Sequence, residues 1–365
     1  MRLADLTTPC LVLDRNILQR NIDTMVQRLE RHRVPLRPHM KTAKSIDVAR
    51  LATAGQPGGI TVSTLAEAEY FAGHGMTDIL YAVGITPQKL DMVAKLNGAG
   101  ATVIVLTDDL DVAAAIAAHP RPPRTLIEVD TGEGRGGIAP DDDLLLAVAA
   151  RLGPCLAGVM THAGHSYAGR SIEAITQIAE AERAGVVRAA EGLRAAGHAA
   201  PIVSMGSSPT VRHAACLDGI TEVRAGVYMF GDLFQAEIGT HELDSIALTV
   251  LTSVIGRRPG RLLVDAGGLA LSKDRSIADA PRDYGFGLVL DVAGKRSFGD
   301  AVVRRAYQEH GVLEADPTYP LDVSVGAKLR IAPNHTCMTA AAHDRYFVVA
   351  GTDEVVAIWP RVNGW

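Results

Sequence analysis

Short apolar runs alternate with helical segments between residues 15 and 240, and this alternation constrains the fold more than any other feature of the sequence. The eight runs begin near Pro35, Gly59, Asp78, Ala101, Arg124, Cys155, Pro201 and Ile220, and segments rich in Ala and Leu separate them. Eight strand–helix units of this size predict a closed parallel (β/α)8 barrel of the TIM type. An open doubly wound sheet also alternates, but it usually has fewer strands and a glycine-rich first turn, which this sequence lacks.

The pattern changes from about Ile246 onward, where turns containing Gly, Pro or Asp separate strand-like segments and few helical periods remain. The segments are Ile246–Leu251, Arg261–Asp265, Gly287–Leu290, Lys328–Ile331 and Tyr346–Val349. They predict a mostly antiparallel β domain. A short strand near Cys10 is assigned to the same domain, because the barrel is complete without it. We therefore predict an N-terminal strand segment at 1–14, a barrel at 15–240 and a C-terminal β domain at 241–365.

Composition limits the classes of function. Apolar residues make up 47% of the 365 residues, which is enough for a large core. The net charge of -5 disfavours nucleic acid as a partner. No apolar run has transmembrane length, and Asp5 and Asp14 interrupt the N-terminus, so we expect neither a membrane partner nor a signal peptide. The four cysteines are widely scattered without disulfide spacing, which favours a reducing cytoplasm.

Lys41 follows the first barrel strand and precedes a helix that begins near Ser45. An α/β barrel places its chemistry at this end of the strands. An ammonium group that loses solvent there has a lowered pKa, so the lysine becomes a Schiff-base nucleophile or a base for an α-proton. By its position alone, a solvated loop lysine beside Lys44 is the more common interpretation, and the rest of the chain is what favours Lys41 as a functional residue.

Two later segments at the same barrel end suit a phosphate group. Gly206, Ser207 and Ser208 lie between a strand and a short helix, where small residues and hydroxyls accommodate an anion. A serine that only caps the helix is the alternative. Tyr228 follows the next strand, and its hydroxyl could reach the same phosphate. The alternative is that Tyr228 is a half-buried packing residue.

Two further loops carry polar side chains. Arg135 lies in a glycine-rich loop and would stabilise a phenolate-type oxygen of a cofactor; a plain surface loop is the alternative. The segment from Thr161 to Tyr167 contains His162 and His165. A histidine there would stack on an aromatic ring or transfer protons, and at least one of the two is expected only to make local hydrogen bonds.

His335 and Cys337 suggest a metal site in the β domain. If this segment is a strand, the two side chains point to the same side and can bind one ion together. Imidazole and thiolate favour zinc, and a site with two protein ligands keeps open positions, as a catalytic metal requires. The segment Gln308–His310 is a candidate source of a third ligand, and Asp265 is a further acid that follows a strand.

Together these motifs resemble the fold-type III pyridoxal-phosphate enzymes, the alanine-racemase-like barrel family. The metal-dependent D-serine dehydratases, including D-threo-3-hydroxyaspartate dehydratases, are the branch most similar. The resemblance spans nearly the whole chain and rests mainly on four segments: 37–44, 206–210, 308–311 and 333–337.

The resemblance implies a role for each motif residue. Lys41 would form the Schiff base with pyridoxal 5'-phosphate, and His162 would act beside it. The phosphate would be held by Gly206, Ser207, Ser208 and Tyr228. Arg135 would face the ring hydroxyl, Tyr167 would line the pocket, and His335 and Cys337 would bind Zn2+ or another divalent ion. A homodimer is also implied.

The activity implied is β-elimination of water from a D-β-hydroxy amino acid to give a 2-oxo acid and ammonia. D-Threonine-type aldolases share the scaffold, but they tend to carry His-x-Asp at the metal and Tyr-His-Gly or Tyr-Gln-Gly where this chain has His162-Ala163-Gly164. Their base is therefore absent here unless His165 replaces it. A non-catalytic pyridoxal-phosphate binder and an amino-acid racemase are two further possible functions. The sequence leaves open whether D-serine, D-threonine or D-threo-3-hydroxyaspartate is preferred.

Overall fold

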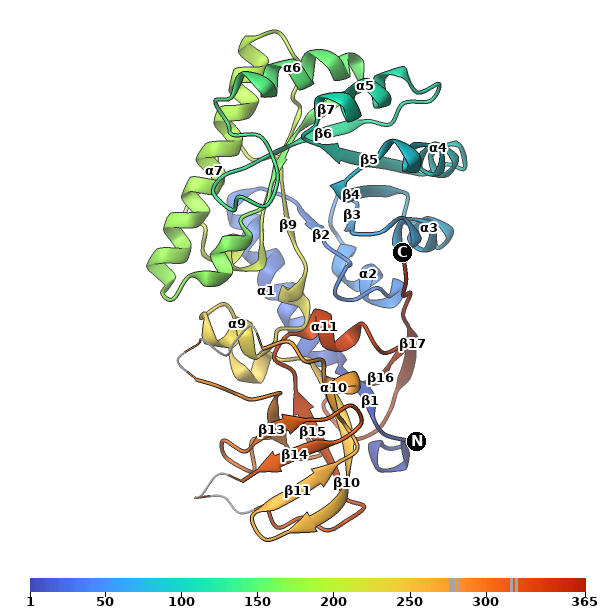
Figure 1. Cartoon of the computed structure of the whole chain (residues 1–365), viewed down its shortest axis with the longest axis vertical. Helices are drawn as coiled ribbons and strands as arrows, with labels where there is room; N and C mark the ends of the chain where they lie inside the picture. The colour runs from blue at the N-terminus through green and yellow to red at the C-terminus, as the bar shows by residue number, and fades with distance from the viewer. Residues whose placement is uncertain (276–279, 281, 316–317, 319–320) are drawn as a thin grey trace. The chain divides into compact units, whose positions relative to one another are not determined.

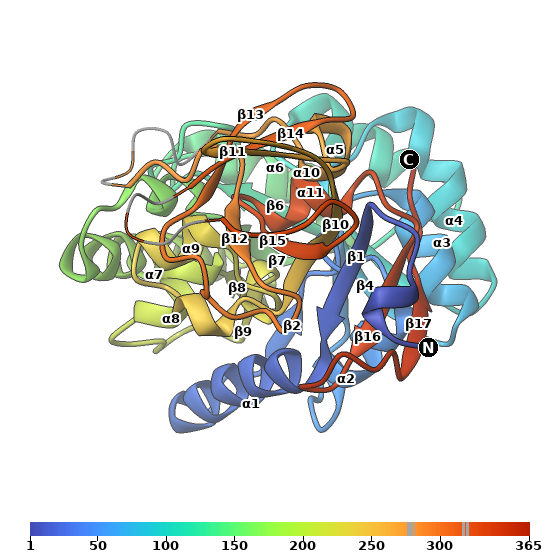
Figure 2. The same ribbon diagram turned by 90° about the horizontal axis from the view of Figure 1, so that it is seen from below.

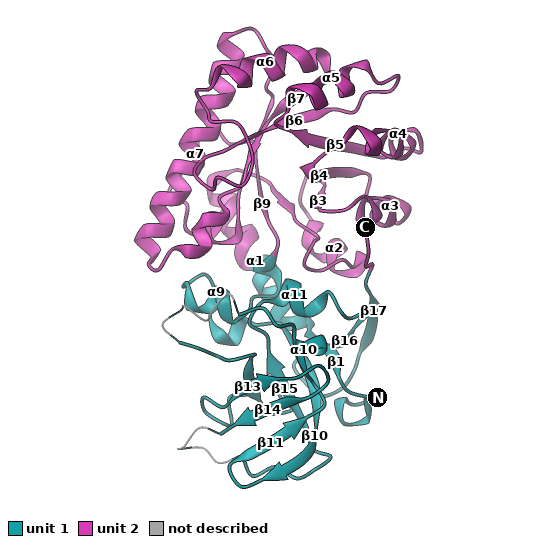
Figure 3. Cartoon of the chain, viewed as in Figure 1, with its two compact units in different colours: residues 1–23, 227–361 teal, residues 24–226, 362–365 magenta. Residues whose placement is uncertain are grey.

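The computed structural model describes residues 1–275, 280, 282–315, 318 and 321–365. Within them the chain forms two compact units (Figure 3). We call residues 1–23 and 227–361 the β unit, and residues 24–226 and 362–365 the barrel unit. Residues 15–23 and 227–240, which were predicted to belong to the barrel, are part of the β unit in this division. The domain limits at residues 15 and 240 stay a prediction.

The barrel unit contains a sheet of eight parallel strands, which confirms the predicted barrel (Figure 1). The strands are β2 (Leu36–Pro38), β3 (Ile60–Val62), β4 (Asp78–Gly84), β5 (Thr102–Thr107), β6 (Thr125–Val129), β7 (Leu156–Thr161), β8 (Ile202–Met205) and β9 (Glu222–Ala225). Each strand from β3 onward pairs with the next in the chain, β2 pairs with β9, and a parallel bridge between His39 and Thr61 joins the end of β2 to β3. The sheet is thus closed, and the residues after each strand lie at one end of it.

Helices follow the strands because the intervening segments carry helical apolar periods and good N-caps. The Asp109 side chain accepts a hydrogen bond from the Val112 N–H, and the Ser171 side chain accepts one from Ala174. The helices are α1 (Arg15–His32), α2 (Ile46–Thr53), α3 (Leu65–Gly73), α4 (Leu90–Gly98), α5 (Leu110–Ala118), α6 (Asp143–Leu152), α7 (Ile172–Ala195) and α8 (Ser208–His213). Short 3-10 helices include η4 (Gly164–Ala168), between β7 and α7. None of the described helices is long and apolar enough to cross a membrane.

The β unit is built on a nine-stranded, mostly antiparallel sheet, as predicted, in the order β11-β14-β13-β12-β15-β10-β1-β16-β17. Its strands are β1 (Cys10–Asp14), β10 (Leu248–Arg258), β11 (Arg261–Val264), β12 (Leu288–Leu290), β13 (Val302–Ala306), β14 (Gly311–Glu314), β15 (Lys328–Ala332), β16 (Arg345–Val349) and β17 (Ala357–Pro360). The N-terminal strand β1 lies between β10, to which it is antiparallel, and β16, to which it is parallel (Figure 2).

Three short helices complete the β unit: α9 (Leu233–Glu237), α10 (Gly268–Leu271) and α11 (Thr336–Ala340). The 3-10 helix η5 (Val227–Met229) begins it after the barrel strands. One apolar cluster contains Leu3, Val12, Leu251 and Val349, so strands from both ends of the chain share a core. Burial of these side chains stabilises the sheet, whose strand β15 precedes His335 in the chain.

Candidate functional site

Lys41 lies directly after β2, in a loop that backbone hydrogen bonds hold tightly. The His39 N–H donates to the Ala225 carbonyl and the Met40 N–H donates to the Thr61 carbonyl, each at 2.8 Å. The loop closes with the Lys44 N–H donating to the Met40 carbonyl at 2.7 Å. The Lys41 side chain itself is exposed. The backbone hydrogen bonds thus fix the position of the loop from which the Lys41 side chain extends at the barrel end.

Lys44 is the second lysine of the same motif and has a positive φ of 47°, which is uncommon for a residue with a side chain. Its ammonium pairs with the buried Glu67 carboxylate at 3.1 Å. The Glu67 carboxylate also accepts from the Ser63 N–H, after β3. The pair therefore ties the loop of Lys41 to the neighbouring strand–helix junction.

His162 lies after β7, within electrostatic range of Lys41. One ring nitrogen, Nδ1, is 2.9 Å from the Gly206 carbonyl and donates to it. Burial, together with the positive charges of Lys41, Arg135 and Arg224, lowers the pKa of His162 to about 3. A neutral imidazole in a fixed orientation suits stacking on a ring better than proton transfer at neutral pH. His39 is likewise held neutral, because burial and Lys41 lower its pKa.

The predicted phosphate cup is buried and pre-organised. Ser207 caps α8, since its hydroxyl accepts from the Thr210 N–H, and it also lies 2.9 Å from the Ser166 hydroxyl. Ser208 is 1% exposed. Gly206 has φ of 134°, and a Cβ there would lie 2.3 Å from the Arg224 carbonyl oxygen, so only glycine fits. The helix cap by Ser207, which was the alternative interpretation, is present. Binding of a phosphate by this loop stays a prediction.

The Gly206 N–H is already engaged, because it donates to the Glu182 carboxylate at 3.0 Å. This removes it from the groups that would contact an anion directly. The remaining candidates in this loop are the hydroxyls of Ser207 and Ser208. Tyr228 lies in η5 of the β unit and is 1% exposed, and burial raises the pKa of its hydroxyl.

Arg135 is exposed and lies between two carboxylates of its own unit. Its guanidinium is 3.5 Å from Glu128 and 3.6 Å from Glu133. Tyr167 is half-buried in η4, and its carbonyl accepts from the exposed Arg170. His165 lies in the same 3-10 helix near the glycine-rich loop, where Gly132 approaches its ring. The structure thus brings Arg135, His162 and Lys41 into one electrostatic neighbourhood.

His335 and Cys337 are arranged differently from the prediction. The segment is not a strand: His335 is the N-cap of α11 and Cys337 lies in its first turn, so the same-side argument for alternate residues is wrong. Tertiary hydrogen bonds cause the difference. The Thr336 N–H donates to the Asp232 carboxylate and the Thr336 hydroxyl donates to the Gly231 carbonyl, which starts a helix there.

The two side chains nevertheless converge. The Cys337 thiol and the His335 imidazole hydrogen-bond each other, and His335 Nδ1 is 2.6 Å from Asp274 Oδ2. Burial disfavours the charged imidazole, but Asp274, Cys337 and Asp232 outweigh it and raise the pKa of His335 to about 11. A nitrogen and a sulfur donor directed at each other, with a carboxylate on the imidazole, fit a borderline-soft divalent ion.

Asp274 was not singled out from the sequence, since it stands in a polar stretch without periodicity. Glu309 and His310 do not join the pair: among the residues that the structure describes, no group of three or more His, Cys, Asp or Glu side chains is arranged around one ion. Asp265 instead accepts from Thr8, Thr252 and Ser253 inside the β unit. It is therefore a structural acid.

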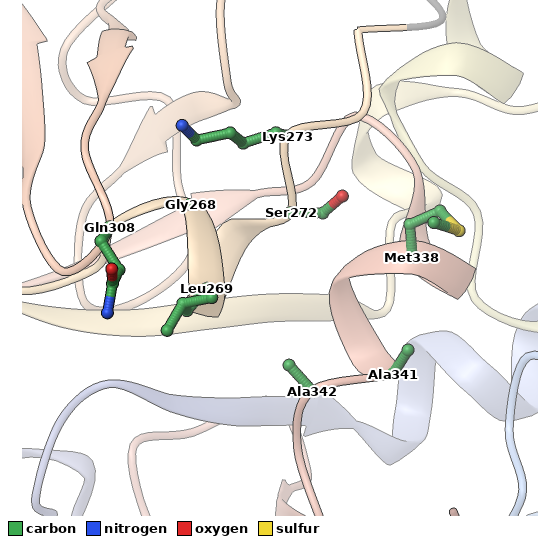
Figure 4. Close-up of a pocket in the computed structure, with 8 residues that line it drawn as sticks. All are labelled: Gly268, Leu269, Ser272, Lys273, Gln308, Met338, Ala341 and Ala342. Carbon is green, nitrogen blue, oxygen red and sulfur yellow. The ribbon is translucent and has the colours of Figure 1, made fainter. Parts of the chain in front are cut away.

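A groove of about 620 Å³ lies beside α11 in the β unit (Figure 4). Its lining is mixed: Ser272, Lys273 and Gln308 are polar, and the remainder are apolar or glycine, namely Gly268, Leu269, Met338, Ala341 and Ala342. Met338 follows Cys337 directly, so the groove borders the helix that carries the thiol.

Two further buried charged residues of the barrel unit, Arg224 and Glu182, were assigned no role from the sequence. Arg224, on β9, donates to the Ser204 hydroxyl and to the Thr161 carbonyl at 2.5 Å each. Glu182, on α7, accepts the Ala163 and Gly206 N–H groups at 3.0 Å each. The apolar period of α7 through Ile175, Ala179 and Val186 places Glu182 on the buried face, and this period is the signal that would have found it.

A family model for the N-terminal domain of alanine racemase matches residues 13–233. The chain belongs to the alanine racemase family. This confirms the family expected from the sequence, and membership implies pyridoxal phosphate as cofactor. A second model, for a serine dehydratase domain, matches residues 247–349 of this alanine racemase family member.

Three similar proteins each cover 98% or more of this chain. D-threo-3-hydroxyaspartate dehydratase of Delftia sp. (strain HT23) is 45% identical over 100% of this chain and 99% of that enzyme. D-serine dehydratase of Dictyostelium discoideum is 29% identical over 99% and 98%. A 3-hydroxy-D-aspartate aldolase of Paracoccus denitrificans (strain Pd 1222) is 31% identical over 98% and 92%.

The solved structure of the Delftia enzyme superposes with a TM-score of 0.96 at 44% identity, covering 100% of both chains. Two variants of D-threo-3-hydroxyaspartate dehydratase are also similar. One has a histidine replaced by alanine, and the other has a cysteine, two positions later, replaced by alanine and is in the metal-free form. The same two residue types stand two positions apart in this family member, at His335 and Cys337.

Proposed function

We propose that this chain is a pyridoxal-phosphate- and metal-dependent dehydratase that eliminates water from a D-β-hydroxy amino acid, with D-threo-3-hydroxyaspartate as the first candidate substrate. The observation that carries the proposal is the 45% identity to the Delftia dehydratase over the full length. The His335–Cys337 pair, at the spacing of the two substituted positions in the dehydratase variants, adds support at the proposed metal site.

Most of the residues proposed to hold the cofactor belong to the barrel unit. The Lys41 amine would hold the cofactor through its carbonyl carbon, and as a free amine it would be the base that accepts the substrate α-proton. The phosphate would be held by Gly206, Ser207, Ser208 and Tyr228. Position 206 has to be glycine, because a Cβ there would clash with the Arg224 carbonyl. Arg135 would face the ring hydroxyl and Tyr167 would line the pocket. When bound, the pyridine ring supplies an electron sink for the pair released from the α-carbon.

His162 would stack on the ring as a neutral imidazole. The hydrogen bond from His162 to the Gly206 carbonyl fixes the orientation of the imidazole. The lowered pKa of His162 keeps the imidazole from competing with Lys41 for the α-proton at neutral pH. Of these two groups, Lys41 is the proposed base.

His335 and Cys337 would hold the metal, and Asp274 would orient the imidazole through Nδ1. Imidazole and thiolate together favour Zn2+ among common divalent ions. When bound, the ion supplies Lewis acidity that makes the β-hydroxyl a better leaving group. The expected homodimer and cytoplasmic location stay predictions.

An aldolase is the second candidate, because the Paracoccus aldolase is 31% identical over nearly the whole chain. Its retro-aldol reaction needs a base for the β-hydroxyl proton. His162 could accept that proton only at Nε2, because Nδ1 donates to the Gly206 carbonyl, and its pKa of about 3 makes it a weak base. Ala163 also follows it where aldolases carry a different pattern. His165 is the remaining candidate for that base.

Product analysis separates these functions. Purified protein is incubated with D-threo-3-hydroxyaspartate, D-serine and D-threonine, each with and without a metal chelator. Ammonia with a 2-oxo acid, lost in chelator, supports the dehydratase. Glycine with an aldehyde establishes the aldolase instead, and cofactor binding without any of these products leaves the non-catalytic binder and the racemase.

A further inference from the structure

Glu182 is a buried carboxylate to which the proposed reaction gives no role. It stands in the middle of α7, is 0% exposed, and shares its face with Ala179 and Val186. A charged group in an apolar helix stripe costs free energy unless hydrogen bonds compensate. The groups that donate hydrogen bonds to Glu182 therefore indicate its role.

One carboxylate oxygen of Glu182 bridges two loops at the active end of the barrel. Oε1 accepts the N–H of Ala163, two residues after the end of β7, and the N–H of Gly206, just after β8, each at 3.0 Å. Ala163 follows His162, and Gly206 precedes Ser207. A single atom thus fixes the spacing between the stacking histidine and the hydroxyls of the predicted phosphate cup.

Arg224 holds the same two strand ends from the other side. It donates to the Thr161 carbonyl, at the end of β7, and to the Ser204 hydroxyl, within β8. The basic group thus contacts positions 161 and 204, and the acidic group contacts 163 and 206. Two further bonds join these loops: His162 to the Gly206 carbonyl, and Ser166 to Ser207.

The electrostatic surroundings of Glu182 agree with this arrangement. Burial raises the pKa of Glu182 to about 7, although the Thr210 hydroxyl, Arg224 and the two backbone N–H groups all favour the charged form. The second oxygen, Oε2, is buried and makes no hydrogen bond of good geometry within the described chain. The carboxylate therefore acts chiefly through Oε1 and its two N–H donors.

We propose that Glu182 is a positioning residue which, by accepting the Ala163 and Gly206 N–H groups, fixes the hydroxyls of Ser207 and Ser208 for the cofactor phosphate. This rests on the proposed cofactor-dependent function. Lys41 lies in a different loop with its own hydrogen bonds to Thr61 and to the strand of Ala225. Loss of Glu182 should therefore weaken recognition of the phosphate while leaving attachment of the carbonyl to Lys41 largely intact.

The test compares pyridoxal phosphate with pyridoxal, which lacks the phosphate, in titrations of apoprotein followed by visible absorbance. In Glu182→Ala, affinity for pyridoxal phosphate should fall about tenfold or more and affinity for pyridoxal by less than about threefold, because the phosphate loop loses the acceptor of its Gly206 N–H while the loop of Lys41 keeps its own hydrogen bonds. Glu182→Gln retains an acceptor oxygen and should restore most of the difference. Glu180→Gln is the matched control, since Glu180 lies on the exposed face of the same helix and pairs with Arg183.

An unchanged ratio of the two affinities in Glu182→Ala would overturn this inference, including the case in which both fall equally because the fold is weakened. A wild-type chain that binds neither compound would instead overturn the proposed function and this inference with it. If Glu182→Ala does not fold, Glu182→Asp carries the same test. Its carboxylate is one methylene shorter and cannot hold both N–H groups, so a selective loss of phosphate affinity of about threefold or more is expected.

Discussion

Replacing Gly206 by alanine should destabilise the barrel unit and disturb its phosphate loop at once. The glycine has φ of 134°, in a region that residues with side chains rarely adopt. An added Cβ would lie 2.3 Å from the Arg224 carbonyl oxygen and 2.8 Å from Val211 Cγ2. The first of these is backbone of a barrel strand, which cannot rotate away.

The magnitude follows from two terms. A strained backbone conformation of this kind costs about 1–3 kcal/mol. Forcing extra volume into a packed site costs about 1–3 kcal/mol more. We therefore expect Gly206→Ala to lower the free energy of unfolding by about 2–6 kcal/mol, the sum of those ranges.

Gly192→Ala provides the control, because a Cβ at that exposed position in α7 meets nothing within 4 Å. Glycine inside a helix is less favourable than alanine by about 1 kcal/mol, so this variant should gain stability. Urea unfolding of the two apoproteins, followed by circular dichroism, measures both. If Gly206→Ala unfolds at the same urea concentration as wild type, the close approach to Arg224 is not rigid and the reasoning fails.

The remaining predictions concern charge and cofactors. Lys41→Ala should lose the visible absorbance of bound cofactor and all activity; retention of both would exclude Lys41 as the attachment point. Cys337→Ala should still bind cofactor but lose elimination unless metal is added in excess, which metal analysis and a chelator series would check. Glu67→Gln leaves the Lys44 ammonium facing a neutral amide, so unfolding free energy should fall by about 3 kcal/mol; equal stability would show that the pair is dispensable. For Glu182 the folded pKa of about 7 lies above its ordinary value of 4.5, so its stabilising contribution is complete below pH 4.5 and is lost as pH rises through 7. Glu182→Gln should remove this slope, and an unchanged pH profile of stability would contradict the raised pKa.

The sequence predicted the barrel because its signal is periodic. Each of the eight parallel strands begins within a few residues of a predicted run, and the N-terminal strand pairs with β10 and β16 in the second sheet. Three strands of the β unit were missed. Of these, β13 and β14 form a hairpin whose turn contains Gln308–His310, the segment that was instead considered as a ligand source.

Motif residues were easier to predict than their surroundings, since motifs depend on residue type and surroundings depend on tertiary contacts. The helix at Thr336 begins because Asp232, about a hundred residues earlier in the chain, accepts its N–H. No local propensity carries that information. Asp274 was missed for the same reason, whereas Glu182 was within reach through the apolar period of α7.

Buried charged side chains thus help to organise the barrel end, in addition to apolar packing of the strands. Glu182 and Arg224 hold the junctions after β7 and β8, and the pair of Glu67 with Lys44 holds the loop of Lys41. Glu182→Leu would refill the volume that Glu182→Ala removes, but it would supply no acceptor for the two N–H groups. It should accordingly unfold at a higher urea concentration than Glu182→Ala and still show the same loss of preference for pyridoxal phosphate over pyridoxal. Stability and phosphate recognition would then be separable at one side chain, which is what a positioning role requires and a packing role forbids.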